Sequence, residues 1–161
     1  MKPIINAGII LGVAAGIWIF INGFAGLYKN LGTAWIFPVV ATVIEILVIV
    51  WGLRKTAQLG RRYGGQVLAG LLIAVVGAVL IMGFSLISAN VFTDTAEVTA
   101  AMQADQWADA GMSEEQIDEM LENTAFTRTP VFQALSGTIA TIVTGLVISL
   151  IAAIFIRKKD A

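Results

Sequence analysis

Glu45 is the residue of this chain whose side chain is best placed to do chemistry, because it is the only ionisable side chain inside a long apolar stretch. A charged carboxylate near the middle of a membrane-spanning helix costs about 2.5–3.5 kcal/mol on insertion scales, so it is expected to face other helices and find partners. No lysine or arginine lies at its depth, which favours the neutral, protonated acid. We expect its hydrogen-bond partners to be Thr141, Thr144 and the indole of Trp18.

Two interpretations of Glu45 stay open from the sequence. It could be the proton-binding or substrate-contacting carboxyl of a small oligomeric carrier or channel, or a protonated acid that only joins neighbouring helices. Polar residues from several helices converging on Glu45 around a water-accessible cavity would favour the carrier. A dry carboxyl bonded to threonines would favour the structural role.

Other chemistries find little support in the residues present. The chain has no cysteine and no histidine, which excludes disulfides, cysteine metal sites and histidine-based catalysis. It also lacks the phosphate-binding loop G-x-x-x-x-G-K-[ST] and the nucleophile motif G-x-S-x-G. We therefore predict no enzyme activity, no catalytic, cofactor-binding or metal-binding residues, and no nucleic-acid partner.

The composition indicates a membrane protein. The chain is 58% hydrophobic and only 13% charged, with a mean hydropathy of +0.86, whereas soluble domains carry about 25% charged residues. A helix needs about 20 mostly apolar residues to cross the bilayer core. Four stretches are long enough: residues 3–27, 33–53, 66–89 and 131–156. The sequence predicts an all-α integral membrane four-helix bundle forming a single membrane domain over residues 1–161.

Charged residues fall on opposite sides of these four predicted spans. Eight of the ten basic residues lie at the N-terminus, between spans two and three, or at the C-terminus: Lys2, Arg54, Lys55, Arg61, Arg62, Arg157, Lys158 and Lys159. Nine of the eleven acidic residues lie between Asp94 and Glu122. Because basic residues are retained in the cytoplasm, we predict cytoplasmic N- and C-termini and an external acidic segment.

Small residues recur at helical spacing in three spans and predict close helix contact. Because lipid tails are as apolar as the helices, the hydrophobic effect does not drive helix association in a membrane, and close packing at small residues contributes instead. The predicted packing positions are Gly8, Gly12, Gly16, Gly70, Ala74, Gly137, Gly145 and Ser149. These positions could meet within one chain or join the chain to a second copy or another membrane protein. We favour internal contact, because four helices must first bury against one another.

The external segment, residues 91–130, is predicted to form an acidic helical hairpin between spans three and four. A first helix is expected to end at Gly111, and a second to start at a capping box formed by Ser113 and Gln116. The hairpin is expected to cover the outer end of the bundle. Its acidic face could attract cations or a basic partner, or could simply be solvated.

Three sequence features together resemble a known family. They are the Gly52-Leu53-Arg54-Lys55 exit from span two with Gly64-Gly65 opening span three, the stretch at residues 111–117, and the ending at residues 145–153 followed by Arg157-Lys158-Lys159. This pattern resembles the domain-of-unknown-function 4199 family of uncharacterised membrane proteins. The resemblance implies a multi-pass protein of the bacterial inner membrane with four spans and no assigned activity.

The first functional hypothesis is therefore a non-enzymatic accessory, scaffold or interaction subunit that contacts the lipid bilayer and a membrane-protein partner or a second copy of itself. The dense small-residue ladders and the acidic external hairpin favour this hypothesis. The alternative is the small oligomeric carrier or channel that uses Glu45.

Overall fold

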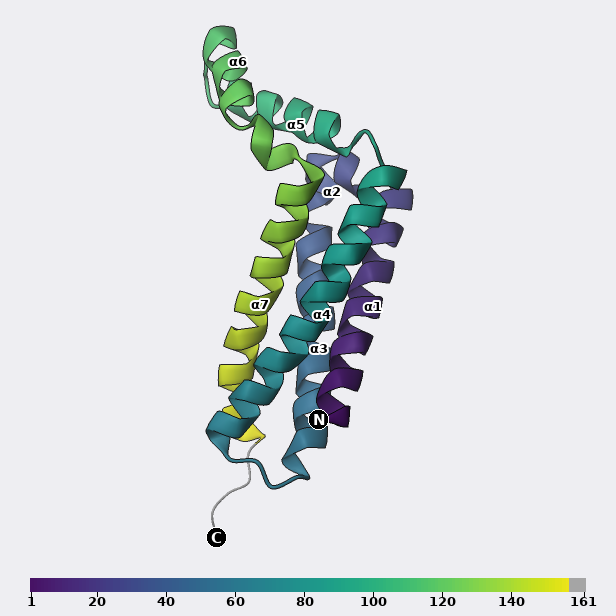
Figure 1. The fold of residues 1–161 in the computed structure, drawn as a ribbon. Coiled ribbons are helices and arrows are strands. Elements are labelled where there is room, and N and C mark those ends of the chain that lie inside the picture. Colours follow the sequence, from purple (N-terminus) through teal and green to yellow (C-terminus); the bar gives the residue numbers. More distant parts are fainter. Residues whose placement is uncertain (157–161) are drawn as a thin grey trace.

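The computed structural model of this chain describes residues 1–156 and consists of long helices joined by short connections (Figure 1). The described residues contain four helices long and apolar enough to span a membrane: α1 (Lys2–Phe24), α3 (Ile36–Ala57, preceded by the short α2, Leu31–Ala34), α4 (Tyr63–Val91) and α7 (Pro130–Phe155). No strand occurs within this range. The predicted all-α, four-span architecture is confirmed.

Helix ends follow local chemistry rather than hydropathy. Helix α1 stops before the predicted residue 27 because Gly26 takes a left-handed backbone conformation, with φ of 65°, which glycine adopts at little cost. Helix α3 runs to Ala57, beyond the predicted residue 53, because Arg54 and Lys55 are good helix formers. Charge therefore ends the apolar stretch without ending the helix.

The two ends of the bundle differ in charge. The start of α1, the connection at residues 58–62 and the end of α7 lie together and form the basic end (Figure 1). The opposite end carries α5 (Thr95–Asp109) and α6 (Glu114–Asn123), and we call it the hairpin end. Arg157, Lys158 and Lys159, which contribute to the predicted orientation, lie outside the described residues.

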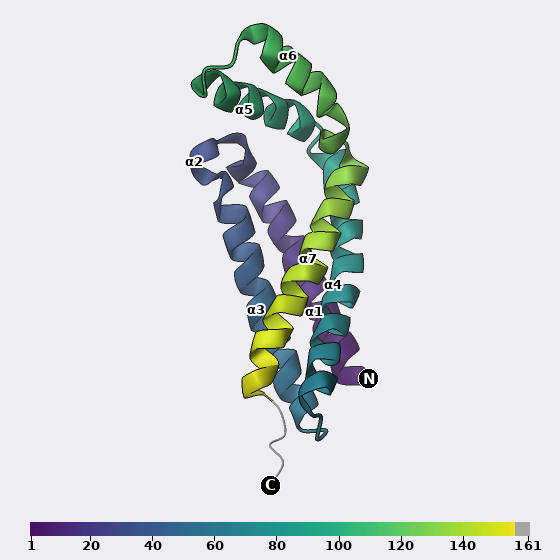
Figure 2. The ribbon, with the colours of Figure 1, turned by 90° about the vertical axis from the view of Figure 1, so that its left-hand side faces the viewer.

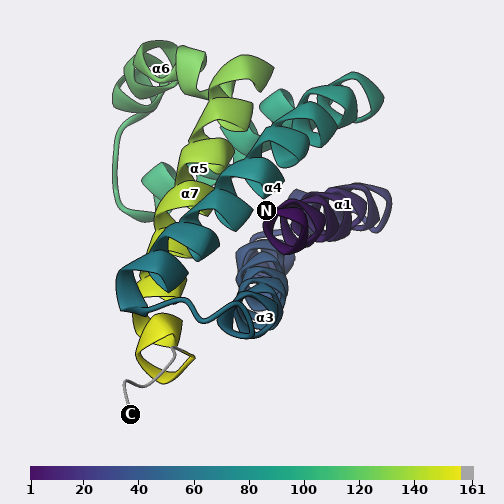
Figure 3. The ribbon, with the colours of Figure 1, turned by 60° about the horizontal axis from the view of Figure 1, so that its bottom comes forward.

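Helix α4 lies between α1 and α7 and packs against both (Figure 3). On the α1 side, the glycine ladder faces three large side chains of α4. A Cβ atom built on Gly8, Gly12 or Gly16 would overlap Val76, Leu80 or Phe84, respectively. These glycines therefore let the two helices approach closely.

Helices α4 and α7 interlock through the small residues of both. A Cβ built on Gly70 would overlap Ser149, and one built on Gly145 would overlap Ala74. Gly137 departs from the predicted packing pattern, since a Cβ built there meets no described atom within 4 Å apart from its chain neighbours and its own helix backbone. The ladder of α7 thus packs only over its half near the basic end.

The core fills the half of the bundle near the basic end. Ile49, Leu53 and Ile73 are fully buried there. A buried polar pair closes this end, where the Thr56 hydroxyl donates to Gln66 Oε1 at 2.6 Å and Gln66 Nε2 donates to the Leu53 carbonyl at 3.3 Å. These bonds satisfy two buried polar side chains and tie α3 to α4.

Toward the hairpin end, α3 and α7 diverge (Figure 2). Helix α3 has its tight contact near the basic end, where a Cβ built on Gly52 would lie 2.6 Å from Ile73 Cδ1 and 2.9 Å from Ala7 Cβ. The outward faces of the spans carry exposed apolar side chains such as Leu47 and Ile139, which implies contact with lipid.

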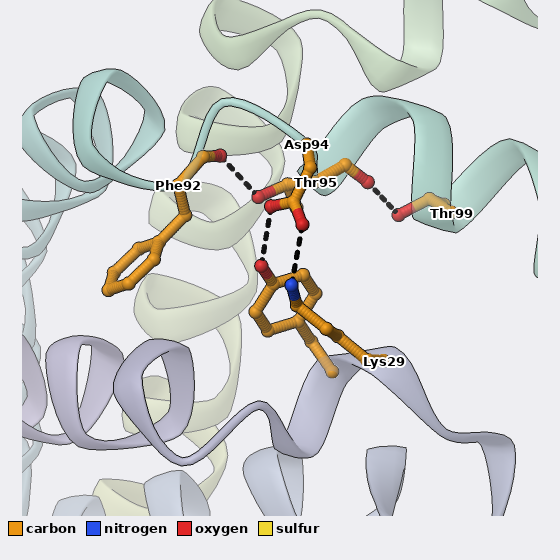
Figure 4. A network of polar contacts seen from close by, with 6 residues as sticks. Lys29, Phe92, Asp94, Thr95 and Thr99 are labelled. Carbon is orange, nitrogen blue, oxygen red and sulfur yellow. Dashed lines mark hydrogen bonds and ion pairs between the residues drawn. The ribbon is translucent and has the colours of Figure 1, made fainter.

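The helical hairpin is capped and tied to the bundle. Ser113 and Gln116 form the predicted reciprocal capping box at the start of α6. Asp94, just before α5, accepts a hydrogen bond from the Tyr28 hydroxyl at 2.6 Å and pairs with Lys29 Nζ at 2.6 Å (Figure 4). This Tyr28–Lys29–Asp94 clasp joins the connection between the first two spans to the hairpin.

The tight contact of α1 with α4 predicts a strong effect of one methyl group. In Gly12→Ala the added Cβ would lie 2.5 Å from Leu80 Cβ, so overpacking should destabilise the protein by about 1–3 kcal/mol. The measurement is the midpoint of thermal unfolding in detergent. Gly83→Ala is the control, because a Cβ built there meets no described atom within 4 Å apart from its chain neighbours and its own helix backbone. An equal loss of stability in both variants would contradict the packing described.

The clasp predicts a pH-dependent anchoring of the hairpin. Hydrogen bonds from Lys29 and then Tyr28 lower the pKa of Asp94, and the hydrogen bond to Asp94 raises the pKa of Lys29. A carboxyl with a depressed pKa stabilises the folded state above its ordinary pKa and loses this effect as pH falls through the lowered value. Asp94→Asn should therefore reduce the protection of α5 amides from hydrogen exchange at neutral pH, but not in strong acid. The control is Asp105→Asn, which replaces an exposed acidic residue of the same helix and should leave that protection unchanged.

Candidate functional site

A cavity of about 570 Å³ occupies the half of the bundle near the hairpin end, where α3 and α7 diverge. Its wall receives residues from all four spans and from the start of α5. The polar and small lining residues and the aromatic pair beside them include Trp18, Asn22, Phe37, Thr42, Glu45, Ser85, Ser88, Thr95, Arg128, Gly137, Ala140, Thr141 and Thr144.

Glu45 forms the floor of this cavity. Its side chain is buried, with 6% of its surface exposed, and Oε1 has no hydrogen-bond partner among residues 1–156. Oε1 lies against α7, since a Cβ built on Gly145 would be 2.9 Å from it. One turn further toward the basic end, fully buried Ile49 begins the closed core. The glycine on α7 makes room for the carboxyl but offers it no side-chain donor.

Trp18, Thr141 and Thr144 line the same cavity as Glu45, but the predicted hydrogen bonds to Glu45 are absent among the described residues. Trp18 Nε1 donates to the Phe37 carbonyl at 3.1 Å, and the Thr141 hydroxyl donates to the Gly137 carbonyl at 3.0 Å. A threonine within a helix commonly satisfies its hydroxyl on the carbonyl four residues earlier. Trp18 and Thr141 therefore line the cavity with Glu45 but satisfy their donors on backbone carbonyls.

Asn22 is a second buried polar residue on the cavity wall, with 8% of its surface exposed. Its Oδ1 atom has no hydrogen-bond partner within the described chain. Sequence reasoning did not select this residue. Its spacing was the available signal, because Asn22 lies one helical turn after Trp18 and therefore on the same face of α1.

The part of the cavity near the hairpin end has a cationic side chain. Arg128 donates to Gln103 Oε1 at 3.0 Å, to the Thr124 hydroxyl at 3.0 Å and to the Leu121 carbonyl. All three partners are uncharged oxygens of the hairpin and the turn that follows it. The cavity therefore runs from a positive group under the hairpin to a carboxyl at its floor.

The cavity opens sideways between α3 and α7. The lining residues of these two helices include exposed Pro38 and Thr42 on α3 and exposed Gly137 and Ala140 on α7. On the opposite side, the glycine face of α1 seals against α4. Exposed residues of α3 and α7 therefore border the cavity on this side.

This arrangement is suited to binding. Two unpaired buried oxygens, on Glu45 and Asn22, are acceptors for donors that the described residues do not supply. No group of three or more acidic, histidine or cysteine side chains that could hold a metal ion occurs in residues 1–156. A ligand that donates hydrogen bonds would satisfy both oxygens, whereas an empty, dry cavity would leave them uncompensated.

Comparison with known proteins identifies a family whose function is unknown. No curated protein and no solved structure matches the chain. A family model described as a protein of unknown function (DUF4199) matches residues 6–158. That match extends through the four spans and the hairpin, so it includes every residue that lines the cavity. The chain therefore belongs to the DUF4199 family of proteins of unknown function.

Proposed function

We propose that this protein is a small, non-enzymatic membrane carrier that binds its solute in the cavity above Glu45. The supporting observation is the convergence of all four spans on one cavity that ends at a buried carboxyl without a hydrogen-bond partner in the described chain. Intramembrane carboxyls of this kind usually mark substrate or ion pathways. The cavity volume of about 570 Å³ falls within the range of small-molecule sites.

A role as an accessory, scaffold or interaction subunit is less well supported. That hypothesis rests on small-residue ladders available to a partner helix. Gly8, Gly12 and Gly16 instead contact α4, and Gly145 and Ser149 contact it from the other side. These ladders are therefore occupied within the chain, which leaves the acidic hairpin as the remaining feature that favours a protein partner.

A carrier fits the geometry better than a channel does. Between Glu45 and the basic end, the bundle is filled by Ile49, Leu53 and Ile73, and the Thr56–Gln66 pair lies beyond them. A continuous pore would require this packed core to separate. A channel would need both halves of the bundle to be open at the same time. A carrier needs the packed half to open only in an alternate state.

The absence of enzyme activity is part of this proposal. The chain contains neither histidine nor cysteine, and Glu45 has no hydrogen-bonded base or nucleophile beside it among residues 1–156. Acid–base and nucleophilic catalysis both require such a positioned partner. We also propose no metal, cofactor or nucleic-acid partner for this function.

We propose that the protein lies in the bacterial inner membrane, with both termini and the basic end in the cytoplasm. The support is the accumulation of Lys2, Arg54, Lys55 and Arg61 at the basic end, because positive residues are retained on the cytoplasmic side. The acidic hairpin would then be external.

This orientation predicts the labelling of single cysteines, which the cysteine-free chain makes simple to introduce. A membrane-impermeant maleimide should react with Ala110→Cys, at the hairpin end, in intact cells. It should react with Gln58→Cys, at the basic end, only after the cells are opened. The reverse labelling pattern would overturn the orientation.

The cavity itself predicts a difference between two adjacent residues of α7. Ala140 lines the cavity, whereas neighbouring Ile139 is exposed on the outer surface and does not line it. Because a thiol reacts as the thiolate, which is disfavoured in apolar surroundings, Ala140→Cys should react much faster than Ile139→Cys with a small water-soluble thiosulfonate. Equal, slow reaction at both positions would contradict a water-accessible cavity, and with it the proposed carrier site.

A further inference from the structure

We infer that the solute of this cavity is an organic cation with an elongated apolar body, which enters from the membrane between α3 and α7 and binds Glu45 through its ammonium group. This inference rests on the proposed function, since it requires the cavity to be a binding site. It adds the chemical class of the ligand and its route of entry.

The charge of the ligand follows from the floor of the cavity. Glu45 Oε1 is buried without a partner in residues 1–156, and Gly145, which faces it on α7, has no side chain to donate. A ligand ammonium supplies donors and a positive charge together, and charge-assisted hydrogen bonds are about twice as strong as neutral ones. An anionic group at the floor would instead be repelled by the carboxylate.

The length of the ligand follows from the register of α1 and α3. Trp18 contacts Phe37, and Ala7 lies beside Gly52, so Glu45 is level with the middle of α1. Asn22 then lies about ten residues, or ~15 Å, closer to the hairpin end at 1.5 Å per helical residue. A ligand that reaches both unpaired oxygens must therefore be elongated, with a second donor near Asn22.

The walls between these two oxygens are suited to an apolar body. Trp18 and Phe37 stack with ring centroids 6.5 Å apart and planes at 11°, and Ala15, Ile19 and Ile81 line the same cavity. Aromatic faces attract cations as well as apolar groups. Arg128, at the far end of the cavity, disfavours the opposite orientation, with the ammonium beneath the hairpin.

The route of entry follows from exposure of the lining residues. Pro38 and Thr42 on α3 and Gly137 and Ala140 on α7 are exposed residues that also line the cavity. An apolar cation partitions into the membrane and so reaches this opening at a raised local concentration. The small side chains of Gly137 and Ala140 leave the passage open.

The test uses two fluorescent probes that differ in one group. One is a dansyl group joined through a hexyl chain to a primary ammonium, and the other is the matched alcohol, in which a hydroxyl replaces the ammonium. Each probe is titrated against the purified full-length protein in lipid nanodiscs, and binding is followed by dansyl fluorescence. The wild type should bind the ammonium probe more tightly than the alcohol by about tenfold or more, as expected for a desolvated charge pair.

Variants locate the preference. Glu45→Gln should lose the preference for the ammonium probe, whereas Glu97→Gln, in α5 and outside the cavity lining, should keep it. Ala140→Phe should weaken the binding of both probes by narrowing the opening of the cavity. Ile139→Phe, at the adjacent exposed position that does not line the cavity, should leave this binding unchanged. Thermal unfolding checks that each variant is folded, and the two-probe comparison in the wild type decides the charge question if Glu45→Gln does not fold.

The outcomes separate this inference from the proposed function. Suppose that both probes bind equally tightly, and that Ala140→Phe weakens this binding whereas Glu45→Gln does not. This result would overturn the inference of a cationic ligand but would leave the cavity as a binding site. No binding of the ammonium probe would also overturn the inference. If Ala140→Phe changes the affinity of neither probe and Ala140→Cys does not react, the inference and the proposed function are both overturned.

Discussion

Close approach of α1 and α7 to α4 is the constraint on which the other features of this structure depend. Lipid tails are as apolar as the helices, so helix association in a bilayer relies on packing at small residues and on hydrogen bonds. Helix α1 presents glycines to Val76, Leu80 and Phe84, and α7 presents Gly145 and Ser149 to Ala74 and Gly70. Three of the four spans are held by these contacts.

Helix α3 is held differently, and the cavity is a consequence. Its tight glycine contact is at Gly52, near the basic end, where the Thr56–Gln66 hydrogen bond also ties it to α4. Above Glu45, α3 presents Ala41, Thr42 and Pro38 to the cavity. Glu45 therefore marks the boundary between the half of the bundle that is packed and the half that is hollow.

Structural features that depend on a local stretch of sequence could be predicted. Features that depend on which faces of two helices pack together could not. Span number follows from the length of each apolar run, and the Ser113–Gln116 capping box follows from local spacing. The contacts of Glu45 depend on the tilt of α7 relative to α3, which no local pattern encodes. The same tilt places Gly137 on the cavity wall instead of in a helix contact.

Two buried groups show the limits of a search based on charge. Gln66 is fully buried and bonded to Thr56, and Asn22 is buried with an unpaired oxygen. Both are neutral and lie near the ends of their spans, where polar residues are ordinarily solvated. Their burial results from the packing of neighbouring helices, and hydropathy alone gave no reason to distinguish them from solvated residues.

The central position of α4 also has a consequence for biogenesis. Spans that enter the bilayer during synthesis do so in chain order, and association between inserted helices is a separate, later stage. Helices α1 and α3 are inserted first, yet the glycine face of α1 fits against α4, which follows them. The glycine face of α1 therefore cannot be buried before α4 is inserted, and until then the face formed by Gly8, Gly12 and Gly16 is available to membrane chaperones or to incorrect helix partners.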